Sequence, residues 1–315
     1  MYPNLFDLER ACCLISLGSV AQNASPAVSN YEATVSDIIF TMRTFFKRQI
    51  ALPQDHGSWV FLLSPLLIGI FAGARLRPEL GFLVIAALAA FLIRQPISMA
   101  VKVYAGRRPK SDLPAAQFWA ALYILLGLIG LIGLAINGLG FVFLLAIPAI
   151  PVFAWHLYLV SRRAERRQEG IEILAAGILA LSAPAALWVE QGAYHPGGWL
   201  LWVLIWLQSA ASIVYAYLRL AQRKMETTPV FSERLKSGRR ALLYTTFNLL
   251  LVAVLCLTGT LPPFLWAGYL LQWLESLWGS LIRPAVGWKP TAIGIRQLII
   301  STLFTILFIL TWRLP

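Results

Sequence analysis

The sequence predicts an all-α membrane protein in which nine transmembrane helices form one bundle. Of its 315 residues, 59% are hydrophobic and only 13% are charged, and the mean hydropathy is +0.72. Soluble chains are about a quarter charged. The apolar runs are continuous and lack the alternation of a membrane β-barrel, and lipid leaves the backbone no other regular structure than the helix. A soluble fold, a disordered chain and a disulfide scaffold are therefore excluded.

The nine spans follow from the positions of the apolar runs. A bilayer core of about 30 Å needs roughly 20 apolar residues per helix, and shorter spans are accommodated by local thinning. We expect spans at residues 59–74, 80–104, 115–136, 139–160, 171–189, 198–220, 241–257, 264–282 and 292–312. Prolines inside these spans are expected to kink them, namely Pro96, Pro148, Pro151 and Pro184. Gly127, Gly130 and Gly133 are expected to allow close helix packing, not to mark a ligand site.

The distribution of Lys and Arg predicts the orientation, because cytoplasmic connections retain positive charge. Twenty-one of these residues lie in the segments on one side of the spans, and only Arg75, Arg77 and Arg313 lie on the other. The N-terminus is therefore expected inside and the C-terminus outside. The net charge of +12 is interpreted as this topology signal and as contact with anionic membrane lipids, not as a nucleic-acid surface.

The chain before the first span differs in composition from the rest. Residues 1–41 carry four acidic residues and one arginine, and we expect them to be a poorly ordered extension that precedes a native start at Met42. Residues 42–57 are expected to form a basic amphipathic segment at the membrane interface. Residues 58–315 form the predicted nine-helix transmembrane domain.

Sequence motifs for cofactors and catalysis are not found. The three cysteines, Cys12, Cys13 and Cys256, have no metal-ligand spacing. No dinucleotide fingerprint, P-loop, zinc set or Ser-His-Asp set occurs. We therefore expect no metal and no cofactor, and we rank binding above catalysis.

Polar and ionisable residues within the spans are the candidates for a functional site, because they are costly in lipid and normally face a cavity. In the predicted orientation nearly all of them lie in the cytoplasmic half, which predicts a polar cavity open to the cytoplasm. The candidate ligand-binding residues are Asp55, His56, Arg94, Ser98, Lys102, His156, Gln208, Arg219, Arg223, Asn248, Glu275 and Arg296. Arg94, Ser98 and Lys102 have the spacing i, i+4, i+8, which places them on one helix face.

Several candidates also have a structural interpretation. Arg94 either contacts a ligand or pairs with Glu275 to hold two helices together. His156 lies between aromatic residues and fits an interfacial belt. Glu275 has no cationic neighbour at helical spacing, so we expect a partner distant in the sequence.

Three short motifs indicate a family. The sequence contains His56-Gly57-Ser58-Trp59 followed by Pro65 and Gly69, then Arg94-Gln95-Pro96, and later Lys289-Pro290 with Gly294-Ile295-Arg296. With these motifs the chain resembles the YwiC-like family of bacterial membrane proteins from about residue 52 to its end. Ser58 departs from the pattern, in which a small residue such as alanine is expected. The resemblance implies a multi-pass protein of the bacterial plasma membrane.

A more distant resemblance is to the UbiA-type intramembrane prenyltransferases. They too have nine helices and an inside N-terminus, and the resemblance implies a site formed by the segments after helices two and six. In that family these segments carry aspartates that bind diphosphate through Mg²⁺. Here they carry Arg94, Ser98 and Lys102, and then Arg219, Arg223 and Lys224. Magnesium needs oxygen ligands, so metal-dependent prenyl transfer is not expected, but cations can hold an anion directly.

The sequence favours a protein that binds an anionic amphiphile, either an isoprenoid phosphate or a phospholipid. Two alternatives stay open. One is a proton-coupled transporter in which Glu275 and His156 relay protons. The other is a non-catalytic scaffold, which is favoured if Arg94 pairs with Glu275 and no cavity exists.

Overall fold

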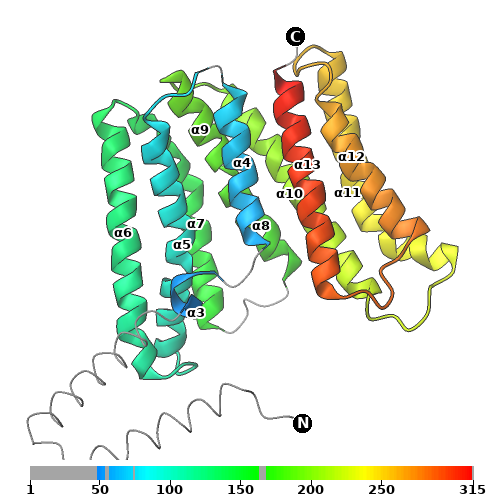
Figure 1. The fold of residues 1–315 in the computed structure, drawn as a ribbon, viewed down its shortest axis with the longest axis horizontal. Helices are drawn as coiled ribbons and strands as arrows, with labels where there is room; N and C mark the ends of the chain where they lie inside the picture. The colour runs from blue at the N-terminus through cyan, green and yellow to red at the C-terminus, as the bar shows by residue number, and fades with distance from the viewer. Residues whose placement is uncertain (1–47, 54–56, 74, 163–167, 314–315) are drawn as a thin grey trace, which may run out of the picture.

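The computed structural model describes residues 48–53, 57–73, 75–162 and 168–313, and these residues are helical with short connections (Figure 1). No strand occurs among them. The elements are α3 (Arg48–Ala51), α4 (Ser58–Ala72), α5 (Leu80–Tyr104), η2 (Lys110–Asp112), α6 (Leu113–Ile136), η3 (Gly140–Leu145), α7 (Ala146–Ser161), α8 (Glu169–Ala180), α9 (Ser182–Gln191), α10 (Gly197–Gln222), α11 (Phe231–Leu257), α12 (Trp266–Leu277), the π-helical η4 (Trp278–Ile282) and α13 (Pro290–Trp312).

Seven helical segments within the described residues are long and apolar enough to cross a membrane. They are α5, η2 with α6, η3 with α7, α8 with α9, α10, α11 and α13. The prediction of an all-helical, multi-pass membrane protein is therefore confirmed. The other two expected spans correspond to shorter elements, α4 with 15 residues and α12 with 12 residues followed by η4. A helix of 15 residues is about 22 Å long, less than the bilayer core, so the count of nine spans stays a prediction.

A proline interrupts the fifth expected span. Pro184 has no backbone N–H to donate to the carbonyl of Ala180, and α8 ends at that residue. The chain turns at Leu181 and becomes helical again at once, with the Ala185 N–H donating to the Leu181 carbonyl. The break lies where the sequence predicted a kink.

Small residues allow the helices to approach closely, as the sequence predicted. A Cβ atom on Gly133 would lie 2.4 Å from the ring of Phe82, and one on Gly130 would lie 2.6 Å from the Phe82 carbonyl oxygen. These contacts join α5 and α6. Likewise a Cβ on Gly69 of α4 would lie 2.3 Å from the carbonyl oxygen of Ala183 in α9. Side chains at these glycines would force the helices apart.

A central set of helices lies between two outer groups (Figure 1). On one side lie α5, α6 and α7, on the other α11, α12 and α13, and α4, α8, α9 and α10 lie between them. Helix α4 connects the groups, because Leu66 belongs to the apolar core with α5, α6 and α9, whereas Ile68 belongs to the core with α10, α12 and α13.

The two ends of the bundle differ in charge. The C-terminal ends of α5, α7 and α10 and the N-terminal ends of α8, α11 and α13 lie at the lower end in Figure 1. In the sequence, Arg107 follows α5 and Arg223 follows α10 at these ends, whereas Arg77 precedes α5 and Arg313 follows α13 at the opposite ends of those helices. The orientation of these ends relative to the cytoplasm stays a prediction.

Part of the expected N-terminal organisation lies outside the described residues. This holds for the extension 1–41 and for most of the segment 42–57, including Asp55 and His56. Residues 48–51 of that segment form α3, in which Ile50 and Ala51 are buried. Ile50 packs with Met99 of α5 and Ala116 of α6.

Candidate functional site

A cavity of about 580 Å³ lies at the basic end of the bundle. Its walls come from the N-terminal turn of α4, the second half of α5, the C-terminal half of α7, most of α8 and one residue of α10. Helix α7 packs against both α5 and α8, and α4 packs against α8. The ring of Trp59 on α4 contacts Phe91 on α5 at 4.9 Å, which places α4 beside α5 as well.

Three of the cavity residues come from one face of α5. Arg94, Ser98 and Lys102 all line the cavity, as their i, i+4, i+8 spacing predicted. The Arg94 guanidinium lies 5.9 Å from the centre of the Phe91 ring. The neighbouring Gln95 donates a hydrogen bond of 2.8 Å to the Gln49 carbonyl, which ties α5 to α3.

Two further ionisable residues of the cavity wall come from α7 and α8. His156 of α7 lines the cavity, so its side chain faces the same space as Arg94 and Lys102. Glu172, in the first turn of α8, also lines it and accepts a hydrogen bond of 2.6 Å from the Tyr217 hydroxyl. Sequence reasoning missed Glu172. The available signal was a second carboxylate, three residues after Glu169, just before an apolar run.

Apolar side chains complete the walls of the cavity. Phe61 of α4, Leu179 of α8 and Ile213 of α10 line it together with the charged groups. The cavity therefore combines cations, one carboxylate and hydrocarbon surface. This combination suits a ligand with a polar head and an apolar body.

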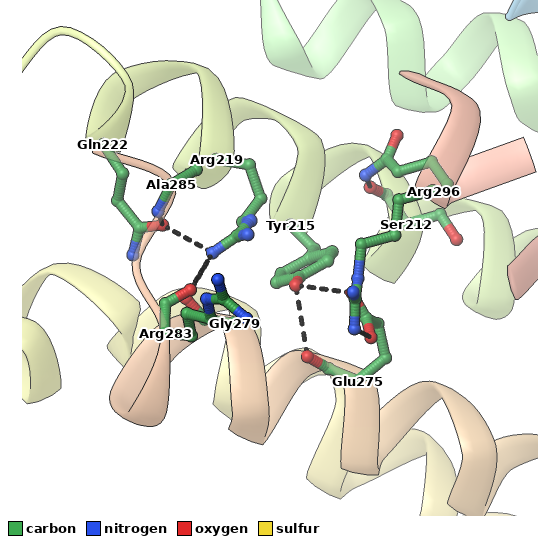
Figure 2. Close-up of polar contacts among 10 residues, drawn as sticks. Ser212, Tyr215, Arg219, Gln222, Glu275, Gly279, Arg283, Ala285 and Arg296 are labelled. Atoms are coloured by element: carbon green, nitrogen blue, oxygen red, sulfur yellow. Dashed lines mark hydrogen bonds and ion pairs between the residues drawn. The ribbon is translucent and has the colours of Figure 1, made fainter. Parts of the chain in front are cut away.

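A second polar cluster lies between α10, α12 and α13, around Glu275 (Figure 2). Arg296 donates two hydrogen bonds of 2.6 Å to the two carboxylate oxygens of Glu275, and its guanidinium lies 3.9 Å from the centre of the Trp278 ring. The Tyr215 hydroxyl donates to Glu275 Oε1 at 2.9 Å. The expected distant partner of Glu275 is thus Arg296, and the alternative pairing with Arg94 is not formed.

Arg219 is buried beside this cluster and is only 1% exposed. Its guanidinium donates to the carbonyl oxygens of Gly279 and Arg283, each at 2.7 Å, and to Gln222 Oε1 at 3.1 Å (Figure 2). Because Gly279 lies in the π-helical η4 and Arg283 just after it, these bonds satisfy carbonyls at an irregular helix end. The structure therefore does not bring Arg219 to the cavity at α5.

Amide side chains extend this cluster, and two of their hydrogen bonds join different helices. Gln272 donates to the Gln208 carbonyl at 3.0 Å, and Asn248 donates to the Leu207 carbonyl at 2.8 Å. The side chain of Gln208 donates to Ser212 at 3.2 Å. A cavity of about 20 Å³ lies beside Ser212, Gln272 and Glu275, enough for about one water molecule.

The twelve candidates thus divide into groups. Arg94, Ser98, Lys102 and His156 line the large cavity. The network between α10, α11, α12 and α13 holds Gln208, Arg219, Asn248, Glu275 and Arg296. Arg223 follows α10 and lines neither cavity, and Asp55 and His56 lie outside the described residues. Within the part of the chain that the structure describes, no group of three or more His, Cys, Asp or Glu residues is placed to hold a metal ion.

The fold and the cavity define a polytopic helical membrane protein with a charged cavity at one end of its bundle. Residues 52–187 match the model of the family described as YwiC-like protein, so the resemblance is confirmed from α4 into α9. Its expected extension to the end of the chain stays a prediction. This region supplies every cavity residue except Ile213. No curated protein and no solved structure matches the chain. The UbiA-type resemblance stays a prediction.

Proposed function

We propose that this protein binds an amphiphile with a phosphate head group, either a phospholipid or an isoprenoid phosphate, in the cavity of about 580 Å³ between α5 and α8. One observation carries the proposal. Arg94, Lys102 and His156, from two different helices, line the same space together with apolar side chains.

Electrostatics supports a phosphate as the recognised group. Basic side chains within membrane helices are rare, and those that face a cavity mark pathways or sites for ions and substrates. Arg94 and Lys102 lie two turns apart on one face of α5, so a phosphate between them interacts with both charges. A guanidinium can bind two phosphate oxygens at once, and charge-assisted hydrogen bonds are roughly twice as strong as neutral ones.

The apolar lining supports a hydrocarbon body. Phe61, Leu179 and Ile213 offer no hydrogen bonds, and they lie in the same cavity as the charged groups. Binding of a water-soluble phosphate would leave these side chains in contact with water. A lipid or prenyl chain would cover them, which is favourable by about 25 cal/mol per Å² of apolar surface removed from water.

The test compares lipid binding by the purified full chain and by its Arg94→Ala variant. A phosphatidylglycerol and a long-chain isoprenyl monophosphate are titrated separately, and complexes are counted by native mass spectrometry. We expect Arg94→Ala to weaken binding of the recognised lipid by at least about tenfold, since loss of a charge-assisted hydrogen bond costs about 1.5–3 kcal/mol. The lipid with the larger Arg94-dependent affinity is the ligand class.

The matched control is Arg239→Ala, which removes the same charge from an exposed position of α11. This variant should bind both lipids as the unmodified chain does. Unchanged affinity of Arg94→Ala for both lipids, or an equal loss in Arg239→Ala, would contradict the proposal.

The scaffold alternative has less support. A pairing of Arg94 with Glu275 and the absence of a cavity would favour it, whereas Glu275 pairs with Arg296 and a cavity lies beside Arg94. The proton relay of a transporter required His156 and Glu275 to act together. These residues line different cavities, and α10 contributes Ile213 to one cavity and Ser212 and Tyr215 to the other.

A further inference from the structure

A carboxylate in the cavity wall narrows the ligand class. Glu172 lines the same space as Arg94, Lys102 and His156, but on α8 and not on α5 or α7. A head group that is only anionic would gain from the cations and would be repelled by this carboxylate. A head group that also carries a positive charge would gain from both walls.

The Glu172 side chain is exposed, and its carboxylate accepts a hydrogen bond from α10. The Tyr217 hydroxyl of α10 donates to its Oε1 atom at 2.6 Å. This bond leaves most of the lone pairs of the carboxylate for other donors. An ammonium group has three donors and no acceptor, so it matches a carboxylate that already has one oxygen oriented by the protein.

The position of Glu172 near the start of a helix also has an ordinary explanation. A comparison with Glu169 distinguishes that explanation from a role at the cavity. Acidic residues in the first turn of a helix interact favourably with the helix dipole. Glu169 lies in the same turn of α8 and has the same relation to the dipole. It pairs with Arg240 at 2.9 Å and does not line the cavity. The dipole therefore does not explain why the second carboxylate lines the cavity.

We infer that the cavity selects an aminophospholipid, a lipid whose head group carries a phosphate and a primary ammonium. The phosphate lies at Arg94 and Lys102, and the ammonium lies at Glu172. The inference rests on the proposed function, because it assumes that the cavity binds a phosphate-bearing amphiphile. Ethanolamine and serine phospholipids share this chemistry, and the serine head group adds a carboxylate that Glu172 disfavours.

The experiment measures head-group preference with matched acyl chains. Dioleoyl phosphatidylethanolamine, phosphatidylserine and phosphatidylglycerol are titrated into the purified full chain, and bound lipid is counted by native mass spectrometry. We expect phosphatidylethanolamine to bind about tenfold tighter than phosphatidylglycerol, with phosphatidylserine between them. In Glu172→Gln the ratio should fall to about one. Glu169→Gln, the control from the same turn, should keep the ratio of the unmodified chain.

The other outcomes of this experiment distinguish failure of the inference from failure of the proposed function. Equal affinity for phosphatidylethanolamine and phosphatidylglycerol in the unmodified chain, or a preference that survives Glu172→Gln, overturns the inference. If the inference is overturned in this way but the lipids still bind in an Arg94-dependent way, the proposed function stands. If no lipid binds in an Arg94-dependent way, the proposed function itself fails.

Discussion

The large cavity and the buried network around Glu275 place the same residue types in different surroundings. In the network, Arg219 donates hydrogen bonds to backbone carbonyl oxygens, and Arg296 pairs with the carboxylate of Glu275. In the cavity, Arg94 and Lys102 line a space of about 580 Å³. The surroundings of an arginine therefore differ between the two regions, and the proposed binding role concerns only the arginine that lines the cavity.

The comparison also separates the two regions by their place along the chain. The cavity is built almost entirely from α4 to α8, within the part that matches the YwiC-like family model. The network is built from α10 to α13, beyond that part. The two regions meet at α10, which contributes Tyr215 to the network and Ile213 to the cavity wall.

The largest expected loss of stability comes from breaking the ion pair between Arg296 and Glu275. Arg296→Met leaves the Glu275 carboxylate, which is 7% exposed, without its cationic partner. Removal of one member of a buried pair costs about 3–5 kcal/mol, and because the Arg296 side chain is 36% exposed we expect a loss at the low end, about 3 kcal/mol of the free energy of unfolding. Unfolding in mixed detergent micelles, followed by tryptophan fluorescence, measures this change.

An exposed ion pair provides the control for this variant. Arg240→Met breaks the bond to Glu169, and the Arg240 side chain is 66% exposed. Exposed pairs contribute less than about 1 kcal/mol. The double variant with Glu275→Met and Arg296→Met should recover part of the lost stability, because no charge is left unpaired. An Arg296→Met chain as stable as Arg240→Met would show that Glu275 is solvated in the folded protein.

A smaller loss of stability is expected when an arginine is replaced by lysine in each of the two regions. Arg219→Lys keeps the charge but loses the planar group that reaches Gly279, Arg283 and Gln222, so we expect a loss of about 2 kcal/mol. Arg94→Lys, at the cavity wall, should change stability by less than about 1 kcal/mol. Chemical denaturation of the two variants in parallel gives both values. Equal losses would mean that Arg94 is also a packing residue.

The sequence predicted those features that depend on local periodicity. The helical repeat alone places Arg94, Ser98 and Lys102 on one face, and the structure shows all three at the cavity. Apolar runs likewise predicted the helices, and Gly133 predicted a close contact. These inferences need only residues within a few turns of each other.

Features that depend on which helices are neighbours could not be predicted in this way. Arg219 was expected at the cavity on the same grounds as Lys102. Instead its guanidinium donates to the carbonyl oxygens of Gly279 in η4 and of Arg283 just after it, about 60 residues later in the chain. The partner of Glu275 was expected to be distant, and only the packing of α12 on α13 identifies it as Arg296. Glu172 was missed because an acidic residue at a helix start has an ordinary explanation.

The smallest changes in stability should come from enlarging side chains on the two faces of α8. Gly177 faces Trp206, and a Cβ there would lie 2.6 Å from the indole ring. The indole cannot move away easily, because its Nε1 donates to the Ile173 carbonyl at 2.8 Å. Overpacking costs about 1–3 kcal/mol, so we expect Gly177→Ala to lower the free energy of unfolding by about 1 kcal/mol.

Two residues earlier on the same helix, Ala175 lines the large cavity. The larger side chain of Ala175→Leu extends into space that a ligand would use, so we expect stability to change by less than about 0.5 kcal/mol. Bound lipid, counted by native mass spectrometry, should decrease by a larger factor in Ala175→Leu than in Gly177→Ala. If Ala175→Leu instead destabilises the chain as much as Gly177→Ala, the wall of α8 is packed in the folded protein and the contrast between the two regions disappears. If both variants are stable and bind lipid equally, the ligand does not occupy this side of the cavity, and the positions of Arg94 and Lys102 on α5 would have to provide binding without α8.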